Sequence, residues 1–90
     1  MQVFVVQADW AIDGNSNSEL KVFSSEYEAR RFFEQKKEDL KQVFNVFDIH
    51  DNLDNDLWEL TQEENYFELY EEGYYNENHC VLTLTKTKVL

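Results

Sequence analysis

The chain of 90 residues has no proline, two glycines and a single cysteine, Cys80. One cysteine excludes an internal disulfide framework and a CxxC metal knuckle, and it suits a reducing compartment. No apolar run approaches the roughly 18 residues of a membrane-spanning helix, and no basic segment precedes an apolar stretch at the start of the sequence. We therefore expect a cytoplasmic protein with neither a membrane span nor a secretory signal, and with no membrane partner.

Basic residues are missing from half of the chain. Residues 42–85 contain eleven acidic residues and no Lys or Arg, whereas residues 1–41 contain eight acidic and six basic residues. Lys86 and Lys88 follow, and the formal net charge of the whole chain is −11. Because the nucleic-acid backbone is itself anionic, the missing basic stripe disfavours direct binding of DNA or RNA. A partner attracted by this charge is expected to be a basic protein.

Large apolar side chains are plentiful despite the charge. Hydrophobic residues make up 42% of the sequence and aromatic residues 16%, which is enough to build a packed core rather than a disordered chain. A chain of this length supports one core and not two. We expect residues 1–90 to form a single domain.

The first strand is predicted from strict alternation over residues 2–12. Phe4, Val6, Ala8, Trp10 and Ile12 share one side of this segment, which we expect to be the inner face. Residues 13–18 are all turn formers, and an apolar segment follows at residues 20–23. The pattern predicts an antiparallel hairpin with a long loop.

The clearest local signal is Ser25-Glu26-Tyr27-Glu28, a capping box that predicts a helix beginning at Glu26. Apolar residues then recur at spacings of three, four and seven as far as Phe47, as on one face of a long amphipathic helix. The opposite face carries acidic and basic residues three or four positions apart, which is typical of a solvated surface. We assign those charges no function.

Three further strands are predicted at residues 57–61, 66–70 and 80–89. In the last of them, Cys80, Leu82 and Leu84 should face the core. The element order is therefore ββαβββ. This order predicts an α+β fold of two layers, in which a mostly antiparallel sheet of about five strands has one long helix packed on one face.

The aspartates of residues 48–56 invite comparison with a calcium-binding loop. Asp48 and Glu59 are twelve positions apart inclusive, as the first and last ligands of an EF-hand are. The third position is His50 and the sixth is Leu53, where the loop needs a ligand and a glycine. A solvated acidic loop with weak cation affinity is the favoured interpretation, and specific Ca²⁺ binding is the alternative.

His50, His79 and Cys80 are the only imidazole and thiol groups, one fewer than a closed structural zinc site usually needs. His79 and Cys80 are adjacent on a predicted strand and so point to opposite faces. We expect a surface histidine and a buried, unreactive cysteine, and no metal or cofactor.

Catalysis is not favoured by any motif. The two glycines provide no phosphate-binding loop, and a small two-layer domain seldom has the cleft that paired catalytic carboxylates require. An acid/base enzyme is therefore the most distant alternative.

The second half of the sequence mixes aromatic and acidic residues. One interpretation is that these rings only fill the core and cover the sheet. Another is a binding surface, because Tyr and Trp bury a large area at little entropic cost. On that interpretation the partner-binding residues are Asp48, Asp51, Asp54, Asp56, Glu59, Glu68, Glu71, Glu72, Tyr74, Tyr75 and Glu77.

In size, charge and aromatic content, the segment from Asp48 to Glu77 resembles the small acidic proteins of phages and mobile elements that imitate DNA and block restriction or CRISPR nucleases. The segment is about a third of the chain. The resemblance implies a non-catalytic, stoichiometric inhibitor, often a homodimer, whose partner is a bacterial nuclease or DNA-binding protein. The chain departs from that class in two respects: its helix is well supplied with Lys and Arg, and its net charge is modest. The alternative is a bacterial interaction domain whose acidity serves only solubility.

Overall fold

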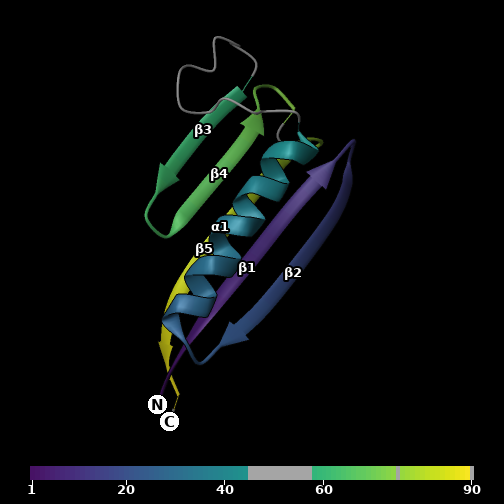
Figure 1. Ribbon diagram of the computed structural model, residues 1–90. Coiled ribbons are helices and arrows are strands. Elements are labelled where there is room, and N and C mark those ends of the chain that lie inside the picture. The colour runs from purple at the N-terminus through teal and green to yellow at the C-terminus, as the bar shows by residue number, and fades with distance from the viewer. Residues whose placement is uncertain (45–57, 75, 90) are drawn as a thin grey trace.

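The computed structural model describes residues 1–44, 58–74 and 76–89 (Figure 1). The predicted order ββαβββ is confirmed, and the elements are β1 (Gln2–Ile12), β2 (Asn15–Phe23), α1 (Glu26–Val43), β3 (Trp58–Glu63), β4 (Tyr66–Glu71) and β5 (His79–Lys88). The calcium-loop interpretation falls on residues 48–59, most of which lie outside the described residues.

The strands form one five-stranded antiparallel sheet in the order β2-β1-β5-β4-β3. The helix α1 lies across one face of this sheet and packs against β1, β2 and β5 (Figure 1). The predicted α+β fold with one helix on one face is confirmed. The two ends of the chain are neighbours, because the Val89 N–H donates to the Met1 carbonyl at 2.8 Å.

The β1–β2 hairpin is tighter than its composition predicts. Its register runs without interruption to the pair Ile12 and Asn15, so the loop is the two residues Asp13 and Gly14, with φ of 52° and 83°. Asp-Gly is a preferred pair for this positive-φ turn, whose twist matches that of the strands. The prediction of a long loop was wrong. Residues 15–18 are polar, but they belong to an edge strand next to solvent, which accepts polar side chains.

The helix begins where the capping box predicts. Ser25 has an extended backbone, and its Oγ accepts a hydrogen bond from the Glu28 N–H at 3.3 Å. Ala29, Phe33 and Leu40 form the buried stripe. The helix ends at Val43, four residues before the predicted end at Phe47, which lies outside the described part of the chain.

The core lies between α1 and the sheet. The inner face of β1 is as predicted, with Phe4, Val6 and Ala8 buried and Trp10 partly buried against the same cluster. The other residues of this core cluster come from the other elements: Ala29, Phe33, Leu40, Phe67, Leu69, Cys80, Leu82 and Leu84. Two pairs of aromatic rings pack against the edges of the core. The ring centroids of Phe23 and Phe32 are 5.5 Å apart, and those of Phe44 and Trp58 are also 5.5 Å apart.

Cys80 is a fully buried core residue, as the sequence predicts. The pKa of its thiol is raised to about 12, chiefly because burial disfavours the thiolate; a hydrogen bond with the Leu69 backbone lowers the pKa in part, and the nearby Glu68 charge raises it by a smaller amount. The thiol therefore stays neutral at physiological pH. A neutral buried thiol is a poor nucleophile.

Substitution of Ser25 by Ala should lower the free energy of unfolding by about 1 kcal/mol, because the Glu28 N–H at the start of α1 loses its acceptor. Urea denaturation followed by circular dichroism measures the change. Ser24→Ala is the matched control, since Ser24 is exposed and is not the N-cap. Equal losses in the two variants would contradict the cap assignment.

Cys80 should resist iodoacetamide at pH 9 in the folded protein and react rapidly in urea. The raised thiol pKa means that the folded state keeps its proton between pH 9 and about 12, whereas the unfolded state releases it. Stability should therefore fall as pH rises through that window.

Cys80→Ala isolates this effect, because tyrosine and lysine titrations are common to both proteins. The variant should be less stable at pH 7, since it loses buried volume, but its stability should fall less steeply above pH 9. Parallel pH profiles of the two proteins would show that the thiol does not titrate differently on folding.

Candidate functional site

The face of the sheet opposite α1 is defined by the pairing registers. Because side chains alternate along a strand, the residues between the core positions project onto this face. We call it the uncovered face, since none of the described helix residues packs on it. Its first three rows, read from β3 to β2, are Glu59, Tyr70, His79, Ala11 and Ser16; then Thr61, Glu68, Val81, Asp9 and Ser18; then Glu63, Tyr66, Thr83, Gln7 and Leu20.

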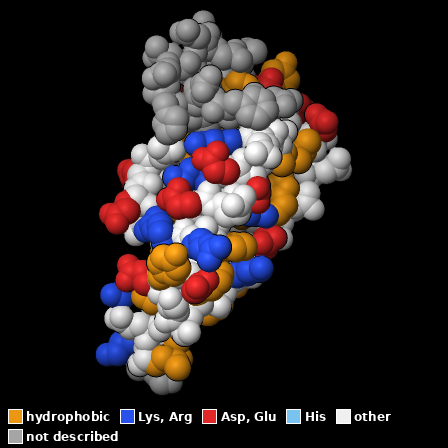
Figure 2. Space-filling model, in the orientation of Figure 1, with side chains coloured by type: hydrophobic (Ala, Val, Ile, Leu, Met, Phe, Trp, Pro, Cys, Tyr) orange, Lys and Arg blue, Asp and Glu red, His pale blue; other side chains and the backbone are white. Residues whose placement is uncertain are grey.

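Charge is divided between the two sides of the sheet. Each of the eight basic residues lies either on α1 or at a strand position that faces it: Lys21, Arg30, Arg31, Lys36, Lys37, Lys41, Lys86 and Lys88. Figure 2 shows Lys and Arg side chains interspersed with carboxylates on the side that carries the helix. The strand rows of the uncovered face hold four carboxylates, Asp9, Glu59, Glu63 and Glu68, and none of the basic residues.

Four of these cations form ion pairs with acidic residues of the first half of the chain. The recorded ion pairs join Lys36 to Glu19 at 3.4 Å, Lys37 to Glu34 at 3.0 Å and Lys41 to Glu38 at 3.2 Å. Arg30 also reaches Glu34, at 3.9 Å, and donates hydrogen bonds to the Glu64 carbonyl and to Asn65 Oδ1. These pairs offset helix and β2 carboxylates, and not those of β3 and β4.

Carboxylates and tyrosines alternate on the part of the uncovered face formed by β3 and β4. Glu59 lies directly opposite Tyr70, and Glu63 lies opposite Tyr66, with Glu68 between the two tyrosines. Directly opposite residues on antiparallel strands are roughly 5 Å apart and diagonal ones roughly 7–8 Å. We call these five residues the acidic–tyrosine patch. Glu59 and Glu63 are exposed, whereas the three β4 residues are half-buried and interact within the protein.

Two of the predicted site residues, Glu59 and Glu68, belong to this patch. Glu72, Tyr74 and Glu77 lie in the turn between β4 and β5, and Tyr74 is 53% exposed. Glu71 lies on the helix side of β4, where its Oε2 accepts a hydrogen bond from Asn78 Nδ2 at 2.9 Å. The other predicted residues lie outside the described part of the chain: Asp48, Asp51, Asp54, Asp56 and Tyr75.

The β4–β5 turn is fixed to the β1–β2 turn by hydrogen bonds. The Gly14 N–H donates to the Glu77 carbonyl at 3.1 Å, and the Asp13 N–H donates to Asn78 Oδ1 at 3.1 Å. Within the turn, the Tyr74 N–H donates to the Glu71 carbonyl at 2.9 Å. Tyr74 is therefore presented from an ordered turn, at the end of the sheet where the row of Glu59 and Tyr70 also lies.

Asp9 and Glu63 also lie on the uncovered face, although neither was predicted as a site residue. Asp9 could have been found, since it alternates with the predicted inner residues of β1. The predicted strand ended at residue 61, so Glu63 fell in the connection to the next strand. In the structure β3 extends as far as Glu63, next to a two-residue turn at Glu64 and Asn65, and Glu63 therefore lies on the uncovered face.

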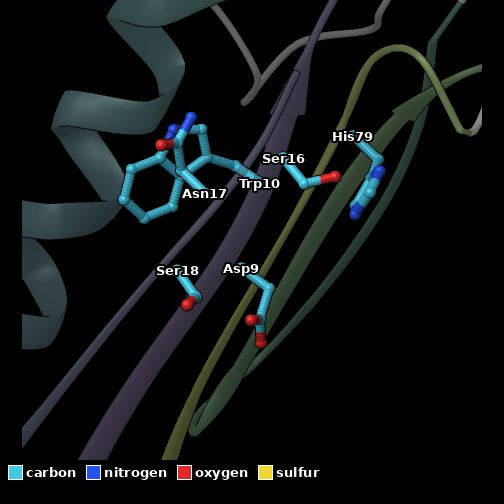
Figure 3. A pocket seen from close by; sticks show the side chains of 6 residues that line it. All are labelled: Asp9, Trp10, Ser16, Asn17, Ser18 and His79. Carbon is cyan, nitrogen blue, oxygen red and sulfur yellow. The ribbon is translucent and has the colours of Figure 1, made fainter. Parts of the chain in front are cut away.

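An open hollow of about 520 Å³ lies at one end of the sheet. Asp9, Ser16 and His79 line it from the uncovered face, and Trp10 with Asn17 lies on the side of α1 (Figure 3). Its carboxylate, imidazole and hydroxyl groups can hydrogen-bond a small polar group. Within residues 1–44, 58–74 and 76–89, no three His, Cys, Asp or Glu side chains gather closely enough to hold a metal ion.

No helix among the described residues has the length and apolar character needed to cross a bilayer. Comparison of the chain with protein-family models, with curated proteins and with solved structures finds no match.

Proposed function

We propose that this chain is a non-catalytic protein-interaction domain that binds a basic protein through the acidic–tyrosine patch and the adjoining β4–β5 turn. One observation carries the proposal: the eight basic residues all lie on the helix side of the sheet, so the opposite side presents carboxylates without cations among them. A solubilising charge has no need of such a separation.

The chemistry of the patch suits a protein partner. Tyrosine rings bury a large area at low entropic cost and recur among the residues that dominate binding energy. Carboxylates around them attract a basic surface from a distance and raise the association rate. Tyr66 and Tyr70 lie within the patch, and the exposed Tyr74 extends the aromatic surface at the end of the sheet.

The finer proposal is that the partner is a bacterial nucleic-acid-binding defence protein, such as a restriction or CRISPR nuclease, and that the patch imitates DNA. The support is the spacing of the charges. Glu68 is diagonal to both Glu59 and Glu63, so the backbone positions that carry successive carboxylates are roughly 7–8 Å apart, which is of the same order as the spacing of phosphates along a nucleic-acid strand. A channel built to neutralise phosphates would also accept these carboxylates.

Neutralising the patch with Glu59→Gln, Glu63→Gln and Glu68→Gln together should abolish capture of a basic protein. The immobilised variant and the wild-type chain are compared as baits in a bacterial lysate, with bound proteins eluted by a salt gradient and quantified by mass spectrometry. For a purified binder, we expect an affinity loss of about tenfold or more at ~0.15 M salt, because the electrostatic attraction is removed.

The matched control is Glu34→Gln, Glu38→Gln and Asp39→Asn on α1, which changes the net charge by the same amount on the opposite side. This variant should capture the same protein as the wild type. Circular dichroism checks that both variants are folded. If both lose the binder equally, total charge rather than the patch is responsible, and acidity that serves solubility becomes the better explanation.

Competition with DNA tests the finer proposal. A fluorescently labelled duplex is bound to each captured nuclease or DNA-binding protein, and fluorescence anisotropy follows its release as the chain is added. We expect wild type and helix control to displace the duplex, with an apparent affinity that falls as salt rises, and the patch variant not to. A ternary complex with the duplex still bound would leave a basic-protein binder that is not a DNA mimic.

A further inference from the structure

The strand β2 forms one edge of the sheet and has features that favour pairing with another strand. It is nine residues long, contains no proline and pairs with β1 in a continuous register without a bulge. Proteins usually protect a long edge with proline, a bulge, a covering segment or charged side chains, because its outer backbone groups are a template for strand addition. Of these, β2 has only the charged side chains of Glu19 and Lys21. Leu20 and Val22 on this edge are each 57% exposed.

The hairpin turn determines which backbone groups of β2 point outward. In a hairpin with a two-residue loop, the closing pair, here Ile12 and Asn15, is hydrogen-bonded, and such pairs alternate along an antiparallel ladder. The intervening residues Ser16, Ser18, Leu20 and Val22 therefore direct their N–H and C=O groups away from β1. Leu20 lies at the centre of the outward-pointing segment from Ser18 to Val22.

We propose that β2 pairs antiparallel with β2 of a second copy of this chain, in a register centred on Leu20, to form a ten-stranded sheet. In this two-fold arrangement Leu20 lies opposite Leu20 of the second copy, and Val22 lies opposite Ser18 of the second copy. Both exposed apolar side chains of the edge then lie at the junction.

Charge complementarity selects this register. Centring on Leu20 places Glu19 opposite Lys21 of the second copy, twice by symmetry. Centring one residue earlier places the two Glu19 side chains opposite each other, and centring one residue later does the same for the two Lys21 side chains. Opposite charges on facing strand positions stabilise a pair and like charges destabilise it, so the Leu20 register is favoured over both neighbours.

The charge distribution also permits two copies to meet at this edge. The acidic–tyrosine patch lies on β3 and β4, at the other side of the sheet from β2. The strand of the patch that is nearest to β2 is β4, three strand positions away in the sheet. This separation is roughly 14 Å, which exceeds the Debye length of about 8 Å at physiological salt. The net charge of the chain therefore does not oppose association through β2 as strongly as its total suggests.

Sedimentation velocity of the purified chain tests the proposal. The wild type should be a dimer whose fraction rises with concentration. Glu19→Lys alone places like charges opposite at both symmetric positions, as does Lys21→Glu alone, so each variant should shift to monomer. An equimolar mixture of the two variants should form a heterodimer, because each copy then supplies the charge that the other lacks.

Controls separate register from folding and from net charge. Circular dichroism confirms that each variant is folded, and Glu34→Lys on α1 changes the net charge as Glu19→Lys does but should leave the dimer intact. If a single variant is unstable, the chain with both Glu19→Lys and Lys21→Glu should still dimerise, since the pairs are only exchanged. A wild-type monomer up to millimolar concentration, dimers unaffected by either substitution, or a mixture that stays monomeric would each overturn the proposal.

Discussion

The structure depends on one constraint: within the described residues, one helix covers only one face of a five-stranded sheet. The alternation of side chains along each strand then assigns every strand residue to a packed side or an uncovered side. The packed positions form the core. The same alternation determines which residues lie on the other side of the sheet. The composition of the uncovered face is therefore a direct consequence of sequence parity and register.

The same constraint explains where the basic residues are used. On the helix side they pair with nearby carboxylates and cover aromatic rings: Lys21 Nζ lies 4.8 Å from the ring centroid of Phe32, and Lys36 Nζ lies 4.6 Å from that of Trp10. Such contacts bury the apolar stems of lysine along the edges of the core. An imbalance of charge along the sequence thus becomes an imbalance between the two sides of one sheet.

Much of this fold could be predicted because its signals are local. The capping box at Ser25 and the alternation of residues 2–12 each specify an element without reference to the rest of the chain. The site was harder, because the uncovered face is assembled by register across five strands. The hairpin length at Asp13 and Gly14 was mispredicted for a similar reason: polar composition does not distinguish a loop from an exposed edge strand. Glu63 was missed because the end of a strand is set by its partner.

The two proposed surfaces are compatible in one assembly. The two-fold axis of an edge-to-edge dimer is perpendicular to the sheet, so both uncovered faces would point the same way. The strand order would run from β3 of one copy to β3 of the other, with the patches at opposite ends and roughly 40 Å apart at the usual strand spacing. A partner with basic surfaces at a matching separation would engage both ends, and the second contact would form at a high effective concentration. Strand pairing at β2 would then strengthen binding at β3 and β4 without adding any contact to the partner.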